Sequence, residues 1–223
     1  IVSDKKDMGP AFSACQEETR KAFGDHHLFI ERYIANPRHI EIQILADRYG
    51  NVIHLGEREC SIQRRYQKII EETPSPAVDP ALRLKMGTMA CSLAREAGYT
   101  NAGTVEFILD EDRNMYFLEM NTRLQVEHPI TELVTGLDLV ELQLKIACGE
   151  VLSIRQEDVS FNGSAIEARI CAEDPSRNFL PATGMITRYA SPRGRNIRVD
   201  SGIVAGSVVS VYYDSLLSKV ISW

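Results

Sequence analysis

Glu106, Glu119 and Asn121 are the residues whose types and spacing most directly indicate chemistry. Glu119 and Asn121 are two residues apart and would share one face of a strand. A hairpin with the preceding strand places Glu106 opposite Glu119, with Cβ atoms about 5 Å apart. Two facing carboxylates repel each other unless a cation lies between them. Together with an amide carbonyl they form an oxygen ligand set that suits Mg²⁺, with phosphate oxygens completing the coordination shell.

The segment that follows, residues 122–129, adds side chains that bind anions and move protons. Loops at strand ends often carry binding and catalytic residues. The planar guanidinium of Arg123 suits a small planar anion, which it can bind through two parallel hydrogen bonds. Glu127 has the chemistry of a general base. His128, directly before Pro129, is more typical of a structural hydrogen-bond partner.

The hairpin itself is predicted from two apolar runs, residues 103–109 and 115–121, on either side of a polar turn. A hairpin tip at residues 111–114 places Asp110 opposite Met115, and this register brings the two glutamates face to face. Both runs are apolar on both faces, which favours a covered sheet. The alternative is a solvated face that carries both glutamates, and a register slip of one residue would also separate them.

The other elements follow from hydrophobic periodicity and from capping residues. Helices are expected at residues 10–23, 80–97 and 138–148, whereas residues 60–68 show no clear periodicity. The pattern changes from mixed α/β to mostly β near residue 160, which predicts an internal boundary there. Strands are expected at residues 28–34, 39–47, 52–57, 164–173, 185–190, 197–200, 207–212 and 217–223, with a turn at 47–51.

The composition excludes several classes of protein. The 223 residues carry 25 Lys and Arg against 31 Asp and Glu, and 44% of them are hydrophobic, as in soluble globular chains. No apolar run approaches the roughly 20 residues of a membrane span, and the acidic balance argues against general nucleic-acid binding. No CxxC pair occurs, so reduced and mostly buried thiols of a cytosolic-type compartment are expected at Cys15, Cys60, Cys91, Cys148 and Cys171.

Residues 117–129 resemble the signature of biotin carboxylase, the ATP-grasp component of biotin-dependent carboxylases. The core Glu-Met-Asn-Thr-Arg is shared with ATP-grasp ligases in general, including carbamoyl-phosphate synthase. The continuation Gln-Val-Glu-His-Pro is far more specific to biotin carboxylase. Independent matches cover nearly the whole chain and lie at residues 31–33, 36–39, 56–65, 168–175 and 212–215.

The resemblance implies a role for each matching side chain in catalysis and in metal binding. It implies the same metal ligands, Glu106, Glu119 and Asn121. It implies that Glu127 deprotonates bicarbonate and that Arg169 steadies the enolate-like oxygen of the biotin ureido ring. The implied bicarbonate site consists of Lys68, Arg123, Gln125 and the backbone of Val126, and the implied catalytic residues are Lys68, Arg123, Glu127 and Arg169.

The resemblance also implies a nucleotide site with two departures from the family pattern. Tyr66 stands where many members carry a His that contacts the nucleotide, and Arg32 replaces a frequent Lys. The residues implied to hold adenine and ribose are Glu31, Arg32, Tyr33, Ile34, His39, Gln63 and Tyr66.

The implied fold is α+β, with the C-terminal half of an ATP-grasp fold, an antiparallel sheet with helices, followed by a strand-rich C-terminal subdomain. Residues 1–34 would be a remnant of the ATP-grasp lid, residues 35–160 the core, and residues 161–223 a truncated subdomain. The chain begins with Ile1 and ends in a strand-like run, and it lacks a Gly-rich loop that would cover phosphates. We therefore expect a piece of a longer protein that is inactive on its own.

The implied activity is ATP-dependent carboxylation of biotin on a carrier protein, with bicarbonate as co-substrate and carboxyphosphate as intermediate. The implied cofactors are ATP, Mg²⁺ or Mn²⁺, and biotin. The expected partners are a biotin carboxyl carrier protein or domain, a carboxyltransferase and a second copy of the chain. An acyl-CoA carboxylase in the cytoplasm, or in the mitochondrial matrix of a eukaryote, is the expected context.

Two other functions stay open, and three of the charged sites have structural alternatives. One alternative is another ATP-grasp ligase, such as carbamoyl-phosphate synthase, and the other is a non-catalytic scaffold. Arg169 would form a structural pair with Glu167, and Lys68 a surface ion pair with Glu71 or Glu72. Residues 64–65, both Arg, would simply be solvated.

Overall fold

The computed structural model describes residues 1–223 and divides into two compact units, Ile1–Asn36 and Pro37–Trp223. The first unit contains a 3₁₀ turn, η1 (Lys5–Asp7), and helix α1 (Met8–Phe23). Gly24 ends α1 in the left-handed region with φ 73°, which confirms the helix predicted at 10–23. The strand predicted at residues 28–34 is wrong. This exposed stretch has no strand hydrogen-bonded beside it, although its sequence is apolar in part.

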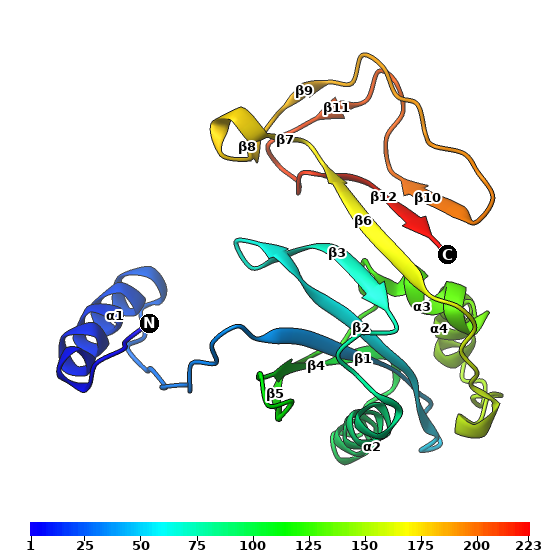
Figure 1. Cartoon of the computed structure of the whole chain (residues 1–223), viewed down its shortest axis with the longest axis horizontal. Coiled ribbons are helices and arrows are strands. Elements are labelled where there is room, and N and C mark those ends of the chain that lie inside the picture. Colours follow the sequence, from blue (N-terminus) through cyan, green and yellow to red (C-terminus); the bar gives the residue numbers. More distant parts are fainter. The chain divides into compact units, whose positions relative to one another are not determined.

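The second unit is built on one eight-stranded antiparallel sheet in the order β10-β12-β6-β3-β2-β1-β4-β5 (Figure 1). Its strands are β1 (Arg38–Ala46), β2 (Val52–Arg64), β3 (Gln67–Thr73), β4 (Asn101–Leu109), β5 (Met115–Asn121), β6 (Ala165–Cys171), β10 (Ile197–Ser201) and β12 (Leu216–Ser222). The sheet thus includes strands from both sides of residue 160. This architecture confirms the predicted α+β class with an antiparallel sheet.

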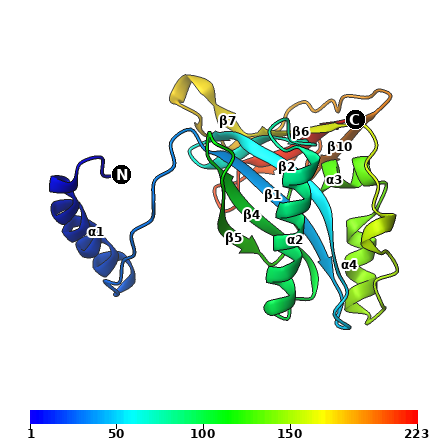
Figure 2. The same cartoon turned by 60° about the horizontal axis from the view of Figure 1, so that its bottom comes forward.

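Three helices and several short elements complete the second unit. The helices are α2 (Pro80–Glu96), α3 (His128–Thr135) and α4 (Leu139–Ala147), and Figure 2 shows α2 lying on the sheet. Asp79 and Asp138 cap α2 and α4 by accepting backbone N–H bonds at 2.8 Å. The short elements are β7 (Glu173–Asp174), β8 (Leu180–Pro181), β9 (Gly184–Met185), β11 (Val208–Val209), η2 (Gln156–Asp158) and η3 (Pro175–Arg177).

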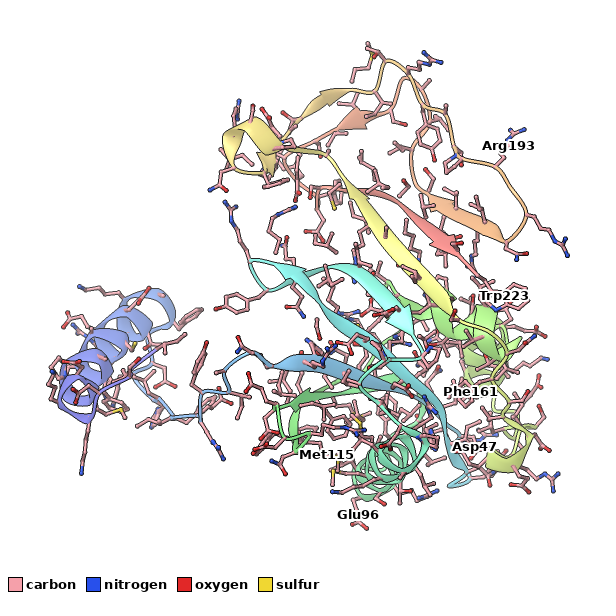
Figure 3. The ribbon with its side chains drawn as sticks, viewed as in Figure 1. Asp47, Glu96, Met115, Phe161, Arg193 and Trp223 are labelled. Atoms are coloured by element: carbon pink, nitrogen blue, oxygen red, sulfur yellow. The ribbon has the colours of Figure 1, made fainter.

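The strand predictions hold where the alternation is regular and fail where it is interrupted. Asp47, labelled in Figure 3, accepts backbone hydrogen bonds from Tyr49 and Asn51 and forms the predicted turn between β1 and β2. Residues 60–68, which show no clear periodicity in the sequence, form the end of β2 and the start of β3, and the pairing of these strands contains register shifts. The strands expected at 185–190 and 207–212 shrink to the two-residue strands β9 and β11.

Strand β1 is covered on both faces, which explains why its polar residues are buried. Ile40, Ile42 and Ile44 pack in one cluster with residues of α2, whereas Leu45 belongs to a second cluster with residues of α4. Glu41 and Gln43 share the face of Leu45 and are completely buried. The core of the sheet therefore presents charged groups on the α3–α4 side, where they need partners.

Gly87 in α2 gives a stability prediction, because an added Cβ would overlap the imidazole ring of His54 on β2. A Gly-to-Ala change inside a helix ordinarily stabilises it. Here we expect Gly87→Ala to lower the free energy of unfolding by about 1–3 kcal/mol through overpacking. Thr88→Ala, at the exposed neighbouring position, is the control and should leave the thermal midpoint equal or slightly higher. Equal midpoints for both variants would refute this packing argument.

No helix in the structure combines the length and the apolar character needed to cross a membrane. All five cysteines are free. Only Cys60 and Cys91 are buried, whereas Cys15 and Cys148 are exposed and Cys171 is half-buried. The expectation of mostly buried thiols is therefore wrong.

Candidate active site

The β4–β5 hairpin places Glu106 directly opposite Glu119, as predicted. The register near the tip differs from the prediction, because Met115 pairs with Leu109 and not with Asp110. An irregularity between Glu106 and its neighbour Phe107 shifts the register back by one residue. The facing glutamates are thus correct, and the predicted pairing at the turn is wrong.

Glu106, Glu119 and Asn121 converge as a metal site requires. The Asn121 amide lies 3.0 Å from Glu106 Oε1 and 3.3 Å from Glu119 Oε1. Rotation of this amide about its last torsion would present the carbonyl oxygen instead of the N–H. The three side chains then offer only oxygen ligands, a donor set that fits Mg²⁺ or Mn²⁺.

Glu106 stays ionised in this setting. Burial opposes its ionisation, but hydrogen bonds from His39 and the charges of Lys68 and His39 lower its pKa to about 2. His39 Nε2 lies 2.7 Å from Glu106 Oε2. The opposite nitrogen of the same ring, Nδ1, lies 2.9 Å from Gln63 Nε2. Two predicted nucleotide residues, His39 and Gln63, therefore adjoin the predicted metal ligands.

Lys68 lies at the centre of three carboxylates and is not the surface ion pair considered as an alternative. Its side chain is 12% exposed, and its Nζ donates to Glu41, Glu127 and Glu106 at 2.6, 2.8 and 2.9 Å. Burial alone would lower the pKa of Lys68, but the carboxylates of Glu41 and Glu127 outweigh it and raise the pKa. Lys68 therefore remains a cation at the floor of the site.

Arg169 on β6 is held by two glutamates. Its Nε donates to Glu71 Oε1 at 2.7 Å, and its Nη2 donates to Glu127 Oε2 at 3.0 Å. The structural pairing with Glu167 considered from sequence is not formed. Glu127, almost fully buried, thus lies between Lys68 and Arg169, and both its oxygens accept charge-assisted hydrogen bonds.

The loop before α3 is fixed by further contacts. His128 Nδ1 lies 2.8 Å from the carbonyl oxygen of Gln125, which supports the structural interpretation of His128. Lys219 on β12 donates to the carbonyl oxygen of Val126. Arg123 is exposed at this loop, and its Nη1 donates to the Leu124 carbonyl at 3.3 Å.

Arg58 on β2 links several residues of the site through buried hydrogen bonds, and the sequence did not predict this role. It is completely buried, and its Nε donates to Glu41 Oε1 at 2.5 Å. Its Nη2 donates to Gln125 Oε1 at 2.9 Å, and Gln125 Nε2 in turn donates to Glu106 Oε1 at 2.8 Å. Gln43, Thr104 and Thr131 accept its other bonds. In the sequence, Glu41 and Gln43 alternate with the isoleucines of β1. This pattern was the indication that a buried polar partner such as Arg58 would be needed.

One open cavity of about 1100 Å³ lies at the site. The turn that joins β2 to β3 forms part of its wall, with Arg65 and Tyr66 in the left-handed region and Tyr66 93% exposed. Every predicted site residue of the second unit lines this cavity: His39, Gln63, Tyr66, Lys68, Glu106, Glu119, Asn121, Arg123, Gln125, Val126, Glu127 and Arg169. Glu31, Arg32, Tyr33 and Ile34 belong to the first unit and stay predicted nucleotide contacts.

The arginines of the β2–β3 turn are not merely solvated. Arg64 pairs with Glu173, and its guanidinium carbon lies 4.2 Å from the ring centroid of Phe179. Arg65 Nη2 donates to the carbonyl oxygen of Asn178 at 2.9 Å. Both arginines tie the turn to the segment that follows β6.

Buried Glu167 gives a pH prediction for stability. Burial raises its pKa to about 8 in spite of Lys219, compared with an ordinary value of 4.5. The folded state then binds more protons than the unfolded state between these values, so the free energy of unfolding falls as pH rises from about 4.5 to 8. Glu167→Gln should flatten this dependence in denaturant titrations at several pH values. Glu96→Gln, at an exposed position, is the control, and an unchanged slope in Glu167→Gln would contradict the argument.

Comparison with known proteins agrees with this geometry. Residues 1–155 match the family model of the carbamoyl-phosphate synthase L chain ATP-binding domain, and residues 167–223 match the biotin carboxylase C-terminal domain. The chain is 56% identical to biotin carboxylase 1 of Bacillus subtilis over its full length, which is 50% of that relative. It is 51% identical to the propionyl-CoA carboxylase alpha chain of Ruegeria pomeroyi, of which it covers 36%.

A solved structure shows the same fold. The biotin carboxylase domain of the Hydrogenobacter thermophilus 2-oxoglutarate carboxylase, a dimer in complex with MgADP, ADP and bicarbonate, superposes with a TM-score of 0.93 at 51% identity. The match covers 100% of this chain and 49% of that one. The chain spans about half the length of this structure and of the Bacillus relative. With both family models matched in order and the fold shared, the chain belongs to the biotin carboxylase family of ATP-grasp proteins.

Proposed function

We propose that the full-length protein containing this chain is a biotin carboxylase, which uses ATP and bicarbonate to carboxylate biotin. The observation that supports this proposal most directly is that one cavity contains two groups of residues. These are the proposed metal ligands of the β4–β5 hairpin and the Lys68–Glu127–Arg169 cluster. The first part suits a phosphate-bound divalent ion, and the second suits a small anion and a proton acceptor.

Glu127 is the proposed base for bicarbonate. Lys68 and Arg169 each hold one of its oxygens, so the carboxylate is oriented before substrate arrives. Arg123 at the cavity wall would bind the planar anion next to this base. Once the proton has moved to Glu127, the ion pairs of Lys68 and Arg169 with its carboxylate are lost. Both cations can then stabilise the negative charge that develops on the substrate.

The ATP end of the cavity would be organised by the hairpin. Glu106, Glu119 and Asn121 would hold Mg²⁺ or Mn²⁺, which neutralises phosphate charge when bound. His39, Gln63 and Tyr66 line the same cavity and are the proposed contacts to the nucleotide.

The wider context is proposed from the relatives. An acyl-CoA carboxylase, the type of the propionyl-CoA carboxylase relative, is the proposed parent, with a biotin carrier and a carboxyltransferase as partners, although a 2-oxoglutarate carboxylase and a pyruvate carboxylase match at the same 51% identity. The dimer named for the Hydrogenobacter domain supports a homodimer. We propose a division near residue 160, supported by the limits of the two matched family models, and a location in the cytoplasm or the mitochondrial matrix.

The test is ADP release by the full-length protein with Mg²⁺ and bicarbonate, in the presence and absence of free biotin. Biotin should stimulate release strongly. Glu119→Gln should raise the Mg²⁺ concentration for half-maximal rate by at least about tenfold, since a metal ligand is lost. Hydrolysis indifferent to biotin would indicate another ATP-grasp ligase, and a complete lack of hydrolysis would indicate a non-catalytic scaffold.

A further inference from the structure

Arg169 depends on Glu71 for its orientation. Arg169 projects from β6 into the cavity wall, and its Nε bond to Glu71 Oε1 at 2.7 Å anchors it from the neighbouring strand β3. Glu127 holds the far end of the same guanidinium. Glu71 itself is completely buried and does not line the cavity, so it touches the proposed substrate site only through Arg169.

Glu71 is paired with a second buried acid. Glu71 on β3 lies directly opposite Glu167 on β6, and both side chains are completely buried. Neither oxygen of Glu167, nor Glu71 Oε2, has a hydrogen-bond partner. Facing carboxylates with buried oxygens that lack hydrogen bonds are costly when both are ionised, whereas one proton shared between them reduces the repulsion.

The charges around the pair come from several elements. Arg169 lies on β6, and Lys219 on β12 has its Nζ 4.0 Å from Glu167 Oε2. Glu127 precedes α3 and Glu41 lies on β1, and both add negative potential at Glu71. Asp200 on β10 shares Lys219 with Glu167, at 3.7 Å from its Nζ. The carboxylates around the pair thus outnumber the cations.

The protonation of the pair is consistent with this geometry. Burial raises the pKa of Glu71 to about 7 and that of Glu167 to about 8, although Arg169 and Lys219 oppose the shifts. A neutral Glu71 still accepts the Nε bond, but it no longer cancels the charge of Arg169. If Glu71 were ionised, its charge and that of Glu127 would together offset the positive charge of Arg169, and the guanidinium would attract a negatively charged substrate only weakly.

We propose that Glu71 is a positioning residue that orients Arg169 toward the cavity. In this proposal Glu71 and Glu167 also share one proton, so that the surrounding carboxylates do not fully offset the positive charge of Arg169. The inference rests on the proposed biotin carboxylase function, in which Arg169 faces negative charge that develops on the biotin ureido oxygen. A fully ionised pair would weaken that interaction at alkaline pH.

Kinetics of the full-length protein test the positioning role. Glu71→Leu removes the acceptor for Arg169 Nε and should lower biotin-dependent kcat/KM by about ten- to a hundredfold. The KM for ATP and the slow ADP release without biotin should change by less than about twofold. Glu71→Gln keeps an acceptor and should rescue the rate at neutral pH. It should also reduce the rise in the KM for biotin that the proposal predicts for the wild type above about pH 8.

Glu72→Gln is the matched control, because Glu72 is the next residue of β3 and its side chain lies on the other face. This variant should behave as the wild type. Glu71→Leu with a wild-type biotin-dependent rate, or with an equal loss in the KM for ATP, overturns the positioning role. A wild-type protein that biotin does not stimulate overturns the proposed function instead, and that result is visible before any variant is made.

Infrared spectroscopy tests the shared proton independently of activity. The wild type at pH 7 should show a carboxylic-acid C=O band that is missing from the Glu71→Gln/Glu167→Gln double variant. Retention of the whole band in the double variant would show that the proton lies elsewhere and would overturn this part of the proposal.

Discussion

Replacing Glu127 with Gln is expected to lower kcat for biotin-dependent ADP release by about 10²–10⁴-fold in the full-length protein. A general base contributes rate enhancements of this size. The amide cannot take the bicarbonate proton, yet it retains the volume of the side chain and an acceptor for Lys68 or Arg169. Because Glu127 is not among the proposed nucleotide contacts, the KM for ATP should stay within about threefold of the wild-type value.

Glu141→Gln is the control for this prediction. Glu141 is an exposed acidic residue of α4 that pairs with Lys145, away from the cavity. Its variant should retain the wild-type kcat. If Glu127→Gln kept more than about a tenth of the wild-type kcat, Glu127 would not be the base, and a proton acceptor elsewhere in the cavity would be required.

Replacing Arg58 with Met should lower the free energy of unfolding by about 3–5 kcal/mol, the range for one partner lost from a buried ion pair. Arg58 and Glu41 are both completely buried, so the variant leaves a carboxylate with only Lys68 to compensate it. Gln125 and Gln43 also lose their charged donor. Urea unfolding monitored by circular dichroism measures the loss.

Two further variants separate charge from packing. Arg58→Met combined with Glu41→Gln should recover part of the stability, since the uncompensated charge is gone. Arg155→Met removes an exposed arginine that also has two acidic partners, and it should change stability little. Equal losses for Arg58→Met and Arg155→Met would contradict the account of Arg58 as a buried cation that stabilises the site residues around it.

The sequence was most informative where chemistry followed local spacing. Glu106 and Glu119 could be placed opposite each other because both strands of their hairpin are adjacent in the chain. The turn was placed one residue away from its true register, and the irregularity beside Phe107 corrected the offset. Family resemblance then extended the set to residues such as Lys68 and Arg169, which the fold brings into the same cavity.

The contacts that hold these residues could not be read from the sequence, since they join distant strands. Arg58, Glu71 and Lys219 reach the site from β2, β3 and β12, and their partners are fixed only once the strand order is known. The end of β2 was missed because its register shifts break the alternation. Residues 28–34 show the opposite error, since an apolar stretch forms a strand only beside a partner strand.

Transfer of labelled carbon from bicarbonate to free biotin by the full-length protein tests the central claim most directly. The wild type should form carboxybiotin in an ATP- and Mg²⁺-dependent manner. Arg169→Ala should abolish the transfer, because Arg169 faces the negative charge that develops on biotin and also holds one oxygen of the base Glu127. ATP turnover without any label on biotin, or undiminished transfer in Arg169→Ala, would contradict the assignment of this cavity as a biotin carboxylation site.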